Sequence, residues 1–314
     1  MNKSKVVIVG TGFVGMSYAY ALLNQGTVEE LILVDINKEK AEGEAMDLNH
    51  GLAFAPRKMT IKAGDYSECL DAGLVVITAG VNQKPGDSRI DLLNRNANII
   101  QSVVRQIMDS GFDGIILTAS NPVDILTYVA WKESKLPSSR VIGSGTSLDT
   151  ARLRYEISQY INIDSRNIHA YILGEHGDSE FVCWSNAFIG AKPIKDVINT
   201  MKEINFDDLD KIYKKVRDAA QEIIKRKKAS YYGIGMALVR ITSAIFNNEN
   251  RIMPISVYND GIYDIDSDLY IGLPAVLNRD GIHHIVKLNL SVQENNKLKK
   301  SAKLLKDSLN KMNI

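Results

Sequence analysis

The sequence predicts an α/β fold in two parts: a doubly wound parallel sheet over residues 1–147 and an α+β domain over residues 148–314. Three observations support this prediction. Apolar runs rich in β-branched residues alternate with helical stretches in the first half, as in βαβ units. A glycine-rich turn joins the first run to the first helical stretch. The alternation stops near Ser147, and the chain is long enough for two cores of roughly 150 residues each.

Six segments of the first half are expected to be strands buried on both faces, because they are apolar without alternation. Helical stretches separate most of them, and right-handed crossovers then give one parallel sheet. The six segments are Val6–Val9, Leu31–Val34, Met59–Lys62, Leu74–Thr78, Gly114–Thr118 and Arg140–Ile142.

The second half mixes helices with turn-linked strands. Apolar residues spaced three and four apart predict an amphipathic helix from Asp207 to Lys227, with Asp207 as its N-cap, and a further helix near the C-terminus. The sequence Asn278–Gly281 is typical of a turn between antiparallel strands. Strands are expected at Ile255–Tyr258, Leu269–Ile271 and Ile285–Leu288.

The composition is that of an ordinary globular protein with a formal net charge of +1, which gives no reason to expect a nucleic-acid partner. The basic run Lys225–Lys228 is interpreted as a solvated helix end. Two cysteines, Cys69 and Cys183, are too few for a disulfide framework or a zinc site, so we expect a cytoplasmic protein without a metal.

Residues Val6–Asn24 carry no charge and follow two lysines, which superficially resembles a signal peptide or a membrane span. Glycines interrupt this apolar run, and no small-residue cleavage site is convincing. A strand, a turn and a helix explain those glycines better. We therefore expect neither export nor a membrane association.

The glycine turn predicts a dinucleotide site. Gly10, Gly12 and Gly15 follow the first strand directly and open a helix, where they allow a tight turn, close approach of a pyrophosphate and close helix–sheet packing. Asp35 ends the next strand about 20 residues later, where a carboxylate binds the ribose 2′-hydroxyl and repels a 2′-phosphate. This spacing favours a Rossmann domain that binds NAD over a structural turn with a surface aspartate.

His176 is the histidine whose setting suggests catalysis. It lies in Leu173–Asp178 between two glycines, which leave room beside the imidazole for a ligand; the other histidines are His50, His169, His283 and His284. Polar segments at 82–89, 120–124 and 148–154 add carboxylates and arginines. Reduction of a 2-keto acid needs a proton donor, a partner that orients it, and a guanidinium for the substrate carboxylate. These segments contain all three.

These motifs resemble those of the L-lactate/malate dehydrogenase family over essentially the whole chain and in the same order. The resemblance implies that His176 is the proton donor, that Asp149 is its partner and that Arg152 binds the substrate carboxylate. It implies that Arg89 polarises the carbonyl from a loop that closes over the site. Asn121 would bind substrate and cofactor, and Asn121–Pro122 is a candidate cis peptide. Taken singly, Asp149 and Arg152 could instead be a helix-surface pair, and Arg89 a solvated loop residue.

The same resemblance extends the cofactor site and suggests the substrate. Further cofactor contacts are expected at Val14, Lys40, Tyr66, Gly80, Ser102 and Ser144. Gln83 stands where the malate enzymes of this family have an arginine, so the expected substrates are pyruvate and L-lactate, unless Gln83 is simply a polar loop residue. Ser230 stands where most lactate-type members have threonine, which could admit slightly larger keto acids.

The chain resembles the bacterial members of this family. Its first strand starts within about five residues, so we expect no N-terminal arm of the kind vertebrate members use in their tetramers. Arg154 and His169 occupy the positions where bacterial members bind fructose 1,6-bisphosphate at a subunit interface. A homotetramer controlled by that effector is expected; the alternative is a solvated arginine and an exposed histidine.

Three other interpretations remain. A related dehydrogenase would act on malate or on branched-chain 2-hydroxy acids. An NAD-dependent glycosidase is expected to need a cysteine and a histidine as metal ligands, and neither cysteine lies in the candidate segments. A non-catalytic NAD-binding redox sensor would leave His176, Asp149, Arg152 and Arg89 unexplained.

Overall fold

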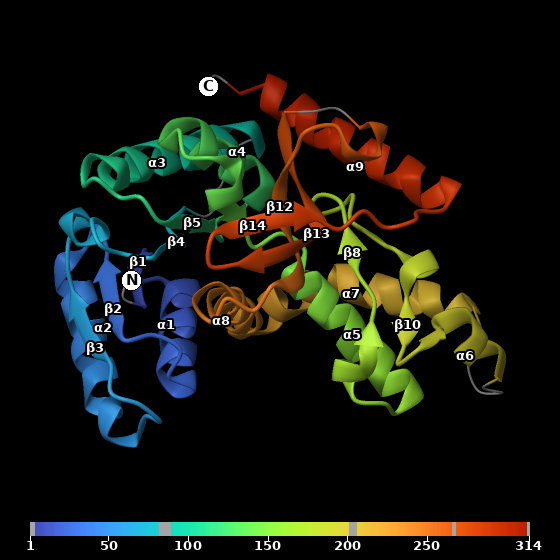
Figure 1. Cartoon of the computed structure of the whole chain (residues 1–314), viewed down its shortest axis with the longest axis horizontal. Helices are drawn as coiled ribbons and strands as arrows, with labels where there is room; N and C mark the ends of the chain where they lie inside the picture. Colours follow the sequence, from blue (N-terminus) through green and yellow to red (C-terminus); the bar gives the residue numbers. More distant parts are fainter. Residues whose placement is uncertain (1–3, 82–88, 201–205, 266–267, 313–314) are drawn as a thin grey trace.

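The structure is a computed structural model that describes residues 4–81, 89–200, 206–265 and 268–312. One nine-stranded sheet runs through the molecule in the order β14-β13-β12-β6-β5-β4-β1-β2-β3 (Figure 1). Six of these strands are parallel, and each end lies within one residue of its prediction. They are β1 (Lys5–Val9), β2 (Glu30–Val34), β3 (Thr60–Ala63), β4 (Leu74–Ile77), β5 (Ile115–Thr118) and β6 (Val141–Gly143).

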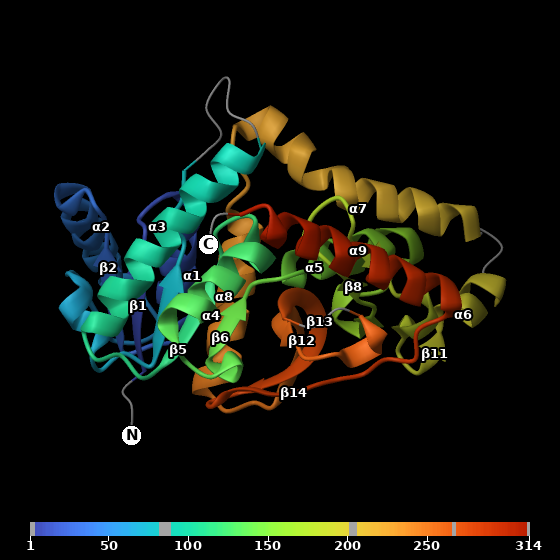
Figure 2. The same cartoon turned by 90° about the horizontal axis from the view of Figure 1, so that it is seen from above.

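The order β3-β2-β1-β4-β5-β6 confirms the predicted doubly wound sheet. In such a sheet a ligand binds beyond the carboxyl ends of the strands, where the strand order reverses between β1 and β4. Helices cover both faces of the sheet (Figures 1 and 2), and five of the six parallel strands are buried on both faces, as predicted. The edge strand β3 is the exception: Thr60 and Lys62 are exposed, so the prediction of a strand buried on both faces is wrong there. Helix α1 packs on α8, and α3 packs on α4. The helices of this part are α1 (Phe13–Gln25), α2 (Lys38–His50), α3 (Arg89–Asp109) and α4 (Val123–Ser134).

The strands of the second half extend this same sheet, which the sequence does not reveal. Strand β12 (Arg251–Asn259) pairs antiparallel with β6 through Ser256 and Gly143, and β13 (Leu269–Asn278) and β14 (Gly281–Ile285) follow it. Gly143 allows this approach, because a Cβ there would lie 2.7 Å from the Ser256 Cβ. The division into domains at residues 147 and 148 remains a prediction.

Strands β12 and β13 contain the predicted segments Ile255–Tyr258 and Leu269–Ile271 but are longer than predicted. Two other details of the second half also differ from the prediction. The strand expected at Ile285–Leu288 is wrong, since β14 ends at Ile285. The turn is so tight that Asn278 pairs with Gly281, and β14 therefore begins at once. Asp207 is not an N-cap, because α7 begins at Phe206 and Asp207 therefore lies in the first turn. An acidic side chain there interacts favourably with the positive end of the helix dipole. The basic run Lys225–Lys228 is exposed at the end of α7, as expected.

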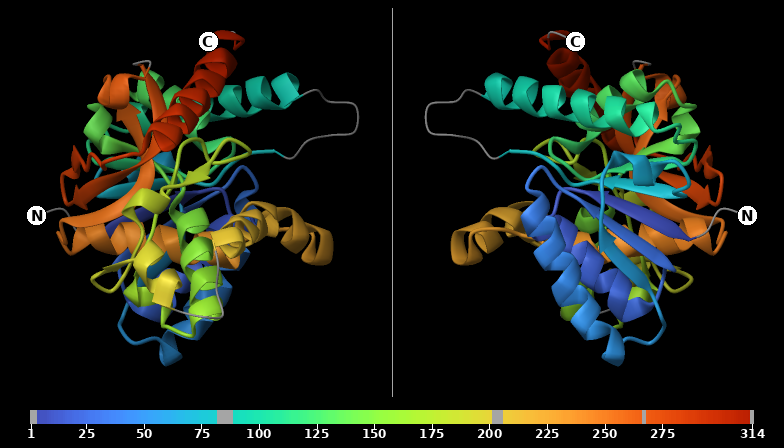
Figure 3. Two further views of the ribbon diagram at one scale, coloured as in Figure 1. Left: turned by 90° about the vertical axis from the view of Figure 1, so that its right-hand side faces the viewer. Right: turned by 90° about the vertical axis from the view of Figure 1, so that its left-hand side faces the viewer.

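The rest of the second half forms a smaller core beside the sheet. Helix α5 packs on α7 around a cluster of buried apolar residues that includes Leu153, Ile157, Ile212 and Val216. Helices α3 and α7 project from the same side of the molecule (Figure 3). The helices are α5 (Ser147–Ile161), α6 (Ile194–Thr200), α7 (Phe206–Lys227), α8 (Tyr232–Phe246) and α9 (Val292–Asn310).

Two small sheets complete the second half. One contains β7 (Ile168–His169), β10 (Phe188–Ile189) and β11 (Lys192–Pro193), and the other contains β8 (Ile172–Leu173) and β9 (Phe181–Val182). Within the described ranges, no helix combines the length and apolar character needed to span a membrane.

Candidate active site and dinucleotide pocket

The three glycines after β1 have different structural roles. Gly10 has φ +106°, and a Cβ there would lie 2.8 Å from the Ala79 nitrogen. A Cβ on Gly15 would lie 2.0 Å from the Gly10 carbonyl oxygen. Gly12 meets nothing within 4 Å and caps α1 without any side-chain hydrogen bond. The fold therefore requires Gly10 and Gly15, whereas Gly12 leaves open space at a helix N-terminus, where an anion binds favourably.

Asp35 is fixed beside this turn. Its Oδ2 accepts hydrogen bonds from the Thr11 backbone nitrogen at 2.7 Å and from Thr11 Oγ1 at 2.8 Å. Burial alone would raise the pKa of Asp35, but these bonds, a bond from the Asn37 backbone and the charge of Lys40 hold it below its ordinary value. Lys40 Nζ donates to the Thr11 carbonyl at 2.5 Å. The carboxylate is thus ionised and held in place, as a ribose-binding group needs to be.

A pocket of about 950 Å³ lies between this turn and α3. Of the predicted cofactor residues, Gly10, Gly12, Asp35, Lys40, Tyr66, Gly80 and Ser102 line it. Val14, Gly15, Ser144 and Asn121 do not line it; Ser144 is buried, and its backbone nitrogen donates to the Thr118 carbonyl at 2.9 Å. The sequence also missed Ile36, an apolar side chain that lines the pocket and is fully exposed. Its position directly after Asp35 is the signal that could have identified it.

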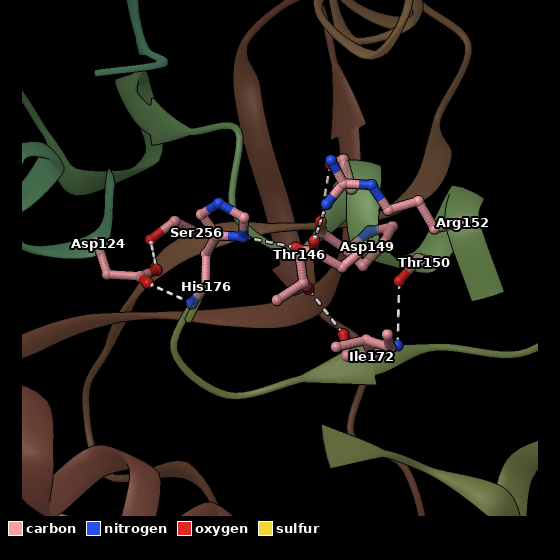
Figure 4. Close-up of polar contacts among 10 residues, drawn as sticks. Asp124, Thr146, Asp149, Thr150, Arg152, Ile172, His176 and Ser256 are labelled. Atoms are coloured by element: carbon pink, nitrogen blue, oxygen red, sulfur yellow. Dashed lines mark hydrogen bonds and ion pairs between the residues drawn. The ribbon is translucent and has the colours of Figure 1, made fainter. Parts of the chain in front are cut away.

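The predicted catalytic residues lie around His176, which is in the loop after β8. Its Nδ1 donates to Asp149 Oδ2 at 2.6 Å, and Arg152 donates to Asp149 Oδ1 at 3.0 Å (Figure 4). Asp149 and Arg152 lie in the first two turns of α5, so their i, i+3 spacing places both on one helix face. The structure therefore brings these three predicted residues together.

Electrostatics favour the protonated form of His176. Burial alone would lower the pKa of His176, but the charge and hydrogen bond of Asp149, with Glu180 and Asp124 nearby, raise it to about 9. Burial would raise the pKa of Asp149, and the charges of His176 and Arg152 hold it low. The pair is therefore an imidazolium and a carboxylate at neutral pH, as expected of a proton donor.

Asp124 supports the histidine loop from the other side, a role that the sequence did not assign to it. Its Oδ2 accepts from the His176 backbone nitrogen at 2.8 Å, and its Oδ1 accepts from Ser256 Oγ at 2.5 Å (Figure 4). Gly174 forms a two-bond bridge with Gly272 of β13. Groups from α4, β12 and β13 thus hold the backbone that carries His176.

Glu180 is a second residue that the sequence missed. It is buried at 5% exposure, and its carboxylate oxygen, an Asp149 oxygen and a His176 ring nitrogen all lie within 4.8 Å of one another. Burial and the charge of Asp149 raise the pKa of Glu180 to about 8. It follows His176 by four residues and carries no motif signal.

The remaining predicted substrate residues are only partly covered. Gln83 lies outside the described residues, and of Arg89 the structure gives only its backbone place at the start of α3. Asn121 is exposed and forms the predicted cis peptide with Pro122. Ser230 is half-buried between α7 and α8.

Arg154, the first predicted effector residue, contacts the segment that follows His169, the second. Arg154 Nε donates to the Ala170 carbonyl at 3.2 Å, and the guanidinium lies over the Tyr171 ring. His169 precedes Ala170 and is exposed on β7. The guanidinium therefore lies next to the backbone segment that carries His169.

Fold and site together are those of a dinucleotide-dependent oxidoreductase. Residues 4–143 match the family model for the NAD binding domain of lactate/malate dehydrogenases, and residues 146–313 match that for their alpha/beta C-terminal domain. The chain belongs to the lactate/malate dehydrogenase family.

Relatives agree with this assignment. L-lactate dehydrogenase 2 of Bacillus cereus (strain ZK / E33L) is 55% identical over 306 residues, which cover 98% of this chain and 97% of the relative. L-lactate dehydrogenase of Geobacillus sp. (strain WCH70) is 54% identical over 98% of this chain and 96% of the relative.

Solved structures agree as well. A lactate dehydrogenase enzyme from a Medee basin deep-sea metagenome library has 76% sequence identity and a TM-score of 0.98, over 99% of both chains. The minor L-lactate dehydrogenase of Enterococcus mundtii in its ligands-bound form has 50% identity and a TM-score of 0.96, over 99% of this chain and 98% of that one.

Proposed function

We propose that this protein is a cytoplasmic NAD-dependent L-lactate dehydrogenase that interconverts pyruvate and L-lactate. The observation that carries the proposal is the His176–Asp149–Arg152 arrangement in a chain of this family. The names of its relatives point the same way.

The residues of the site suit this reaction. Bound NADH supplies the hydride. His176 directs Nδ1 to Asp149, which leaves Nε2 to give a proton to the carbonyl oxygen and to accept it back in the reverse reaction. Arg152 uses NH1 on Asp149, so its other N–H groups can bind the substrate carboxylate bidentately. Arg89 would polarise the carbonyl, and Asn121 and Ser230 would complete the substrate contacts.

The cofactor assignment to NAD rests on the ionised carboxylate of Asp35 and on the open space at Gly12. A 2′-phosphate beside Asp35 would bring two negative charges together, so NADPH is disfavoured. Val14, Gly15, Ser144 and Asn121 stay as proposed cofactor contacts, although they lie outside the lining of the pocket.

NADH oxidation measured with pyruvate, oxaloacetate and 2-ketoisocaproate tests the function. We expect the highest kcat/KM with pyruvate. Preference for oxaloacetate or 2-ketoisocaproate would favour the related dehydrogenases, and NADH binding without turnover of any keto acid would favour a redox sensor. Gln83→Arg should raise kcat/KM for oxaloacetate and lower it for pyruvate, because a guanidinium can pair with the second carboxylate. An unchanged ratio would contradict the role of Gln83.

We further propose a homotetramer activated by fructose 1,6-bisphosphate at Arg154 and His169. The hydrogen bond from Arg154 to the residue after His169 supports a shared anion site. Pyruvate KM and sedimentation at low protein concentration, with and without millimolar bisphosphate, test it. Wild type should respond and Arg154→Leu should not; an equal response of the two proteins would contradict the assignment.

A further inference from the structure

Glu180 is a buried carboxyl group in the active site that the proposed mechanism does not use. Only 5% of Glu180 is exposed. Its backbone is fixed at both ends: its nitrogen donates to the Gly177 carbonyl at 3.2 Å, and its carbonyl accepts from the Tyr213 hydroxyl. Its carboxyl group makes no hydrogen bond or ion pair with any residue that the structure describes. One of its oxygens nevertheless lies within 4.8 Å of a His176 ring nitrogen and of an Asp149 carboxylate oxygen.

We propose that Glu180 is a positioning residue that keeps the proton on His176 as the pH rises. The proposal rests on the proposed function, in which His176 gives and accepts the substrate proton. A buried carboxylate this close to an imidazolium stabilises the positive charge, so His176 loses its proton at a higher pH.

The charged and titratable groups around Glu180 explain why one carboxyl group can matter. Among the described residues, several elements place charged or titratable groups near the His176–Glu180 pair: Asp149 and Arg152 from α5, Asp124 from α4, Glu175 from the same loop and Tyr213 from α7. The charges of Asp149 and Glu175 raise the pKa of Glu180, and those of His176 and Arg152 lower it. Burial is the largest cause of the rise and, together with these charges, brings the pKa of Glu180 to about 8, so Glu180 is neutral below that pH and ionised above it.

Because the pKa of Glu180 lies below that of His176, Glu180 ionises before His176 loses its proton. Below pH 7 Glu180 is neutral, and a glutamine would imitate it. Above pH 8 its carboxylate opposes proton loss from His176, whose pKa is about 9. Glu180→Gln should therefore lower the pKa of His176 by about one without changing turnover at low pH.

A histidine titration followed by NMR with labelled imidazole tests this directly, and it does not depend on turnover. The His176 signal is the one that His176→Asn removes. We expect its midpoint to fall by about one pH unit in Glu180→Gln, to return in Glu180→Asp, which restores a carboxylate, and to stay unchanged in Asp178→Asn, which removes an exposed carboxylate from the same loop. A midpoint in Glu180→Gln equal to that of wild type would overturn the proposal. Should Glu180→Gln fail to fold, Glu180→Leu decides, because it also removes the carboxylate: a midpoint below that of wild type supports the proposal, and a wild-type midpoint overturns it.

The kinetic counterpart uses lactate oxidation, which needs a neutral His176. The acid limb of kcat/KM for L-lactate should move to lower pH by about one unit in Glu180→Gln, while pyruvate turnover at pH 6.5 stays within about twofold of wild type. Equal loss of activity at all pH values would show a merely structural role and would refute the proposal. If neither wild type nor any variant turns over pyruvate or lactate, but the His176 midpoint falls in Glu180→Gln, the proposed function fails and the charge effect of Glu180 on His176 stands.

Discussion

The glycine turn after β1 and the histidine loop after β8 are both short loops that follow a strand, yet different contacts hold them. In the glycine turn, a Cβ on Gly15 would lie 2.0 Å from the Gly10 carbonyl oxygen, so two of the turn's own residues decide that this position is glycine. Asp35 and Thr78 add hydrogen bonds to the turn from neighbouring strand ends. The histidine loop is held by Asp124, by Asp149 and by β13. The need for glycine in the turn can be predicted from six residues, whereas the partners of the histidine loop lie on elements that the loop's own sequence does not reveal.

The strongest test of this contrast is His176→Asn. Removing the proton donor should reduce kcat for pyruvate about 1,000-fold or more. NADH binding should stay unchanged, because His176 does not line the dinucleotide pocket. Stopped-flow turnover and NADH fluorescence titration measure the two effects. A variant that keeps more than about a tenth of wild-type kcat would show that His176 is not the acid.

Gly15→Ala and Gly12→Ala separate fold from ligand within the glycine turn. A Cβ at Gly15 meets the Gly10 carbonyl oxygen at 2.0 Å, so we expect a loss of about 3 kcal/mol in the free energy of unfolding. Gly12→Ala meets no atom and should leave stability unchanged but weaken NADH binding. Denaturant unfolding and NADH titration check both; equal stability loss in the two variants would refute the distinction.

Asp124→Ala tests whether the histidine loop depends on its distant support. Without the bond from the His176 backbone, the imidazole should lose its alignment, and kcat should fall about 10- to 100-fold. Ser256→Ala is the matched control, since it removes the other hydrogen bond of Asp124 and leaves the bond to His176. If the two variants lose the same activity, Asp124 acts through β12 and not through the loop.

Asp35→Ala should have the smallest effect. Loss of the carboxylate removes the repulsion of a 2′-phosphate, so the preference for NADH over NADPH should drop about tenfold while kcat with NADH stays near wild type. The ratio of kcat/KM for the two cofactors measures this. An unaffected ratio would place the ribose contact at another residue.

The same contrast shows what the sequence could predict. Strand ends came within one residue because buried parallel strands are continuous apolar runs, and His176, Asp149 and Arg152 could be grouped because their chemistry fits one reaction. The antiparallel pairing of Ser256 with Gly143 leaves no local pattern. Glu180 and Asp124 gain their roles from burial next to charges on other elements, and a single carboxylate in a sequence looks the same whether it is solvated or buried.

The pairing of β12 with β6 has a consequence for synthesis on the ribosome. Strand β6 ends at Gly143, but its partner at Ser256 emerges more than 100 residues later. At roughly 5–20 residues per second, the nascent chain presents an open strand edge for about 5–20 seconds. An unpaired edge of apolar strands is a template for association between chains, so the nascent chain is open to such association during this interval. Slow translation between residues 143 and 256 should therefore lower the soluble yield more than the same slowing placed before β6.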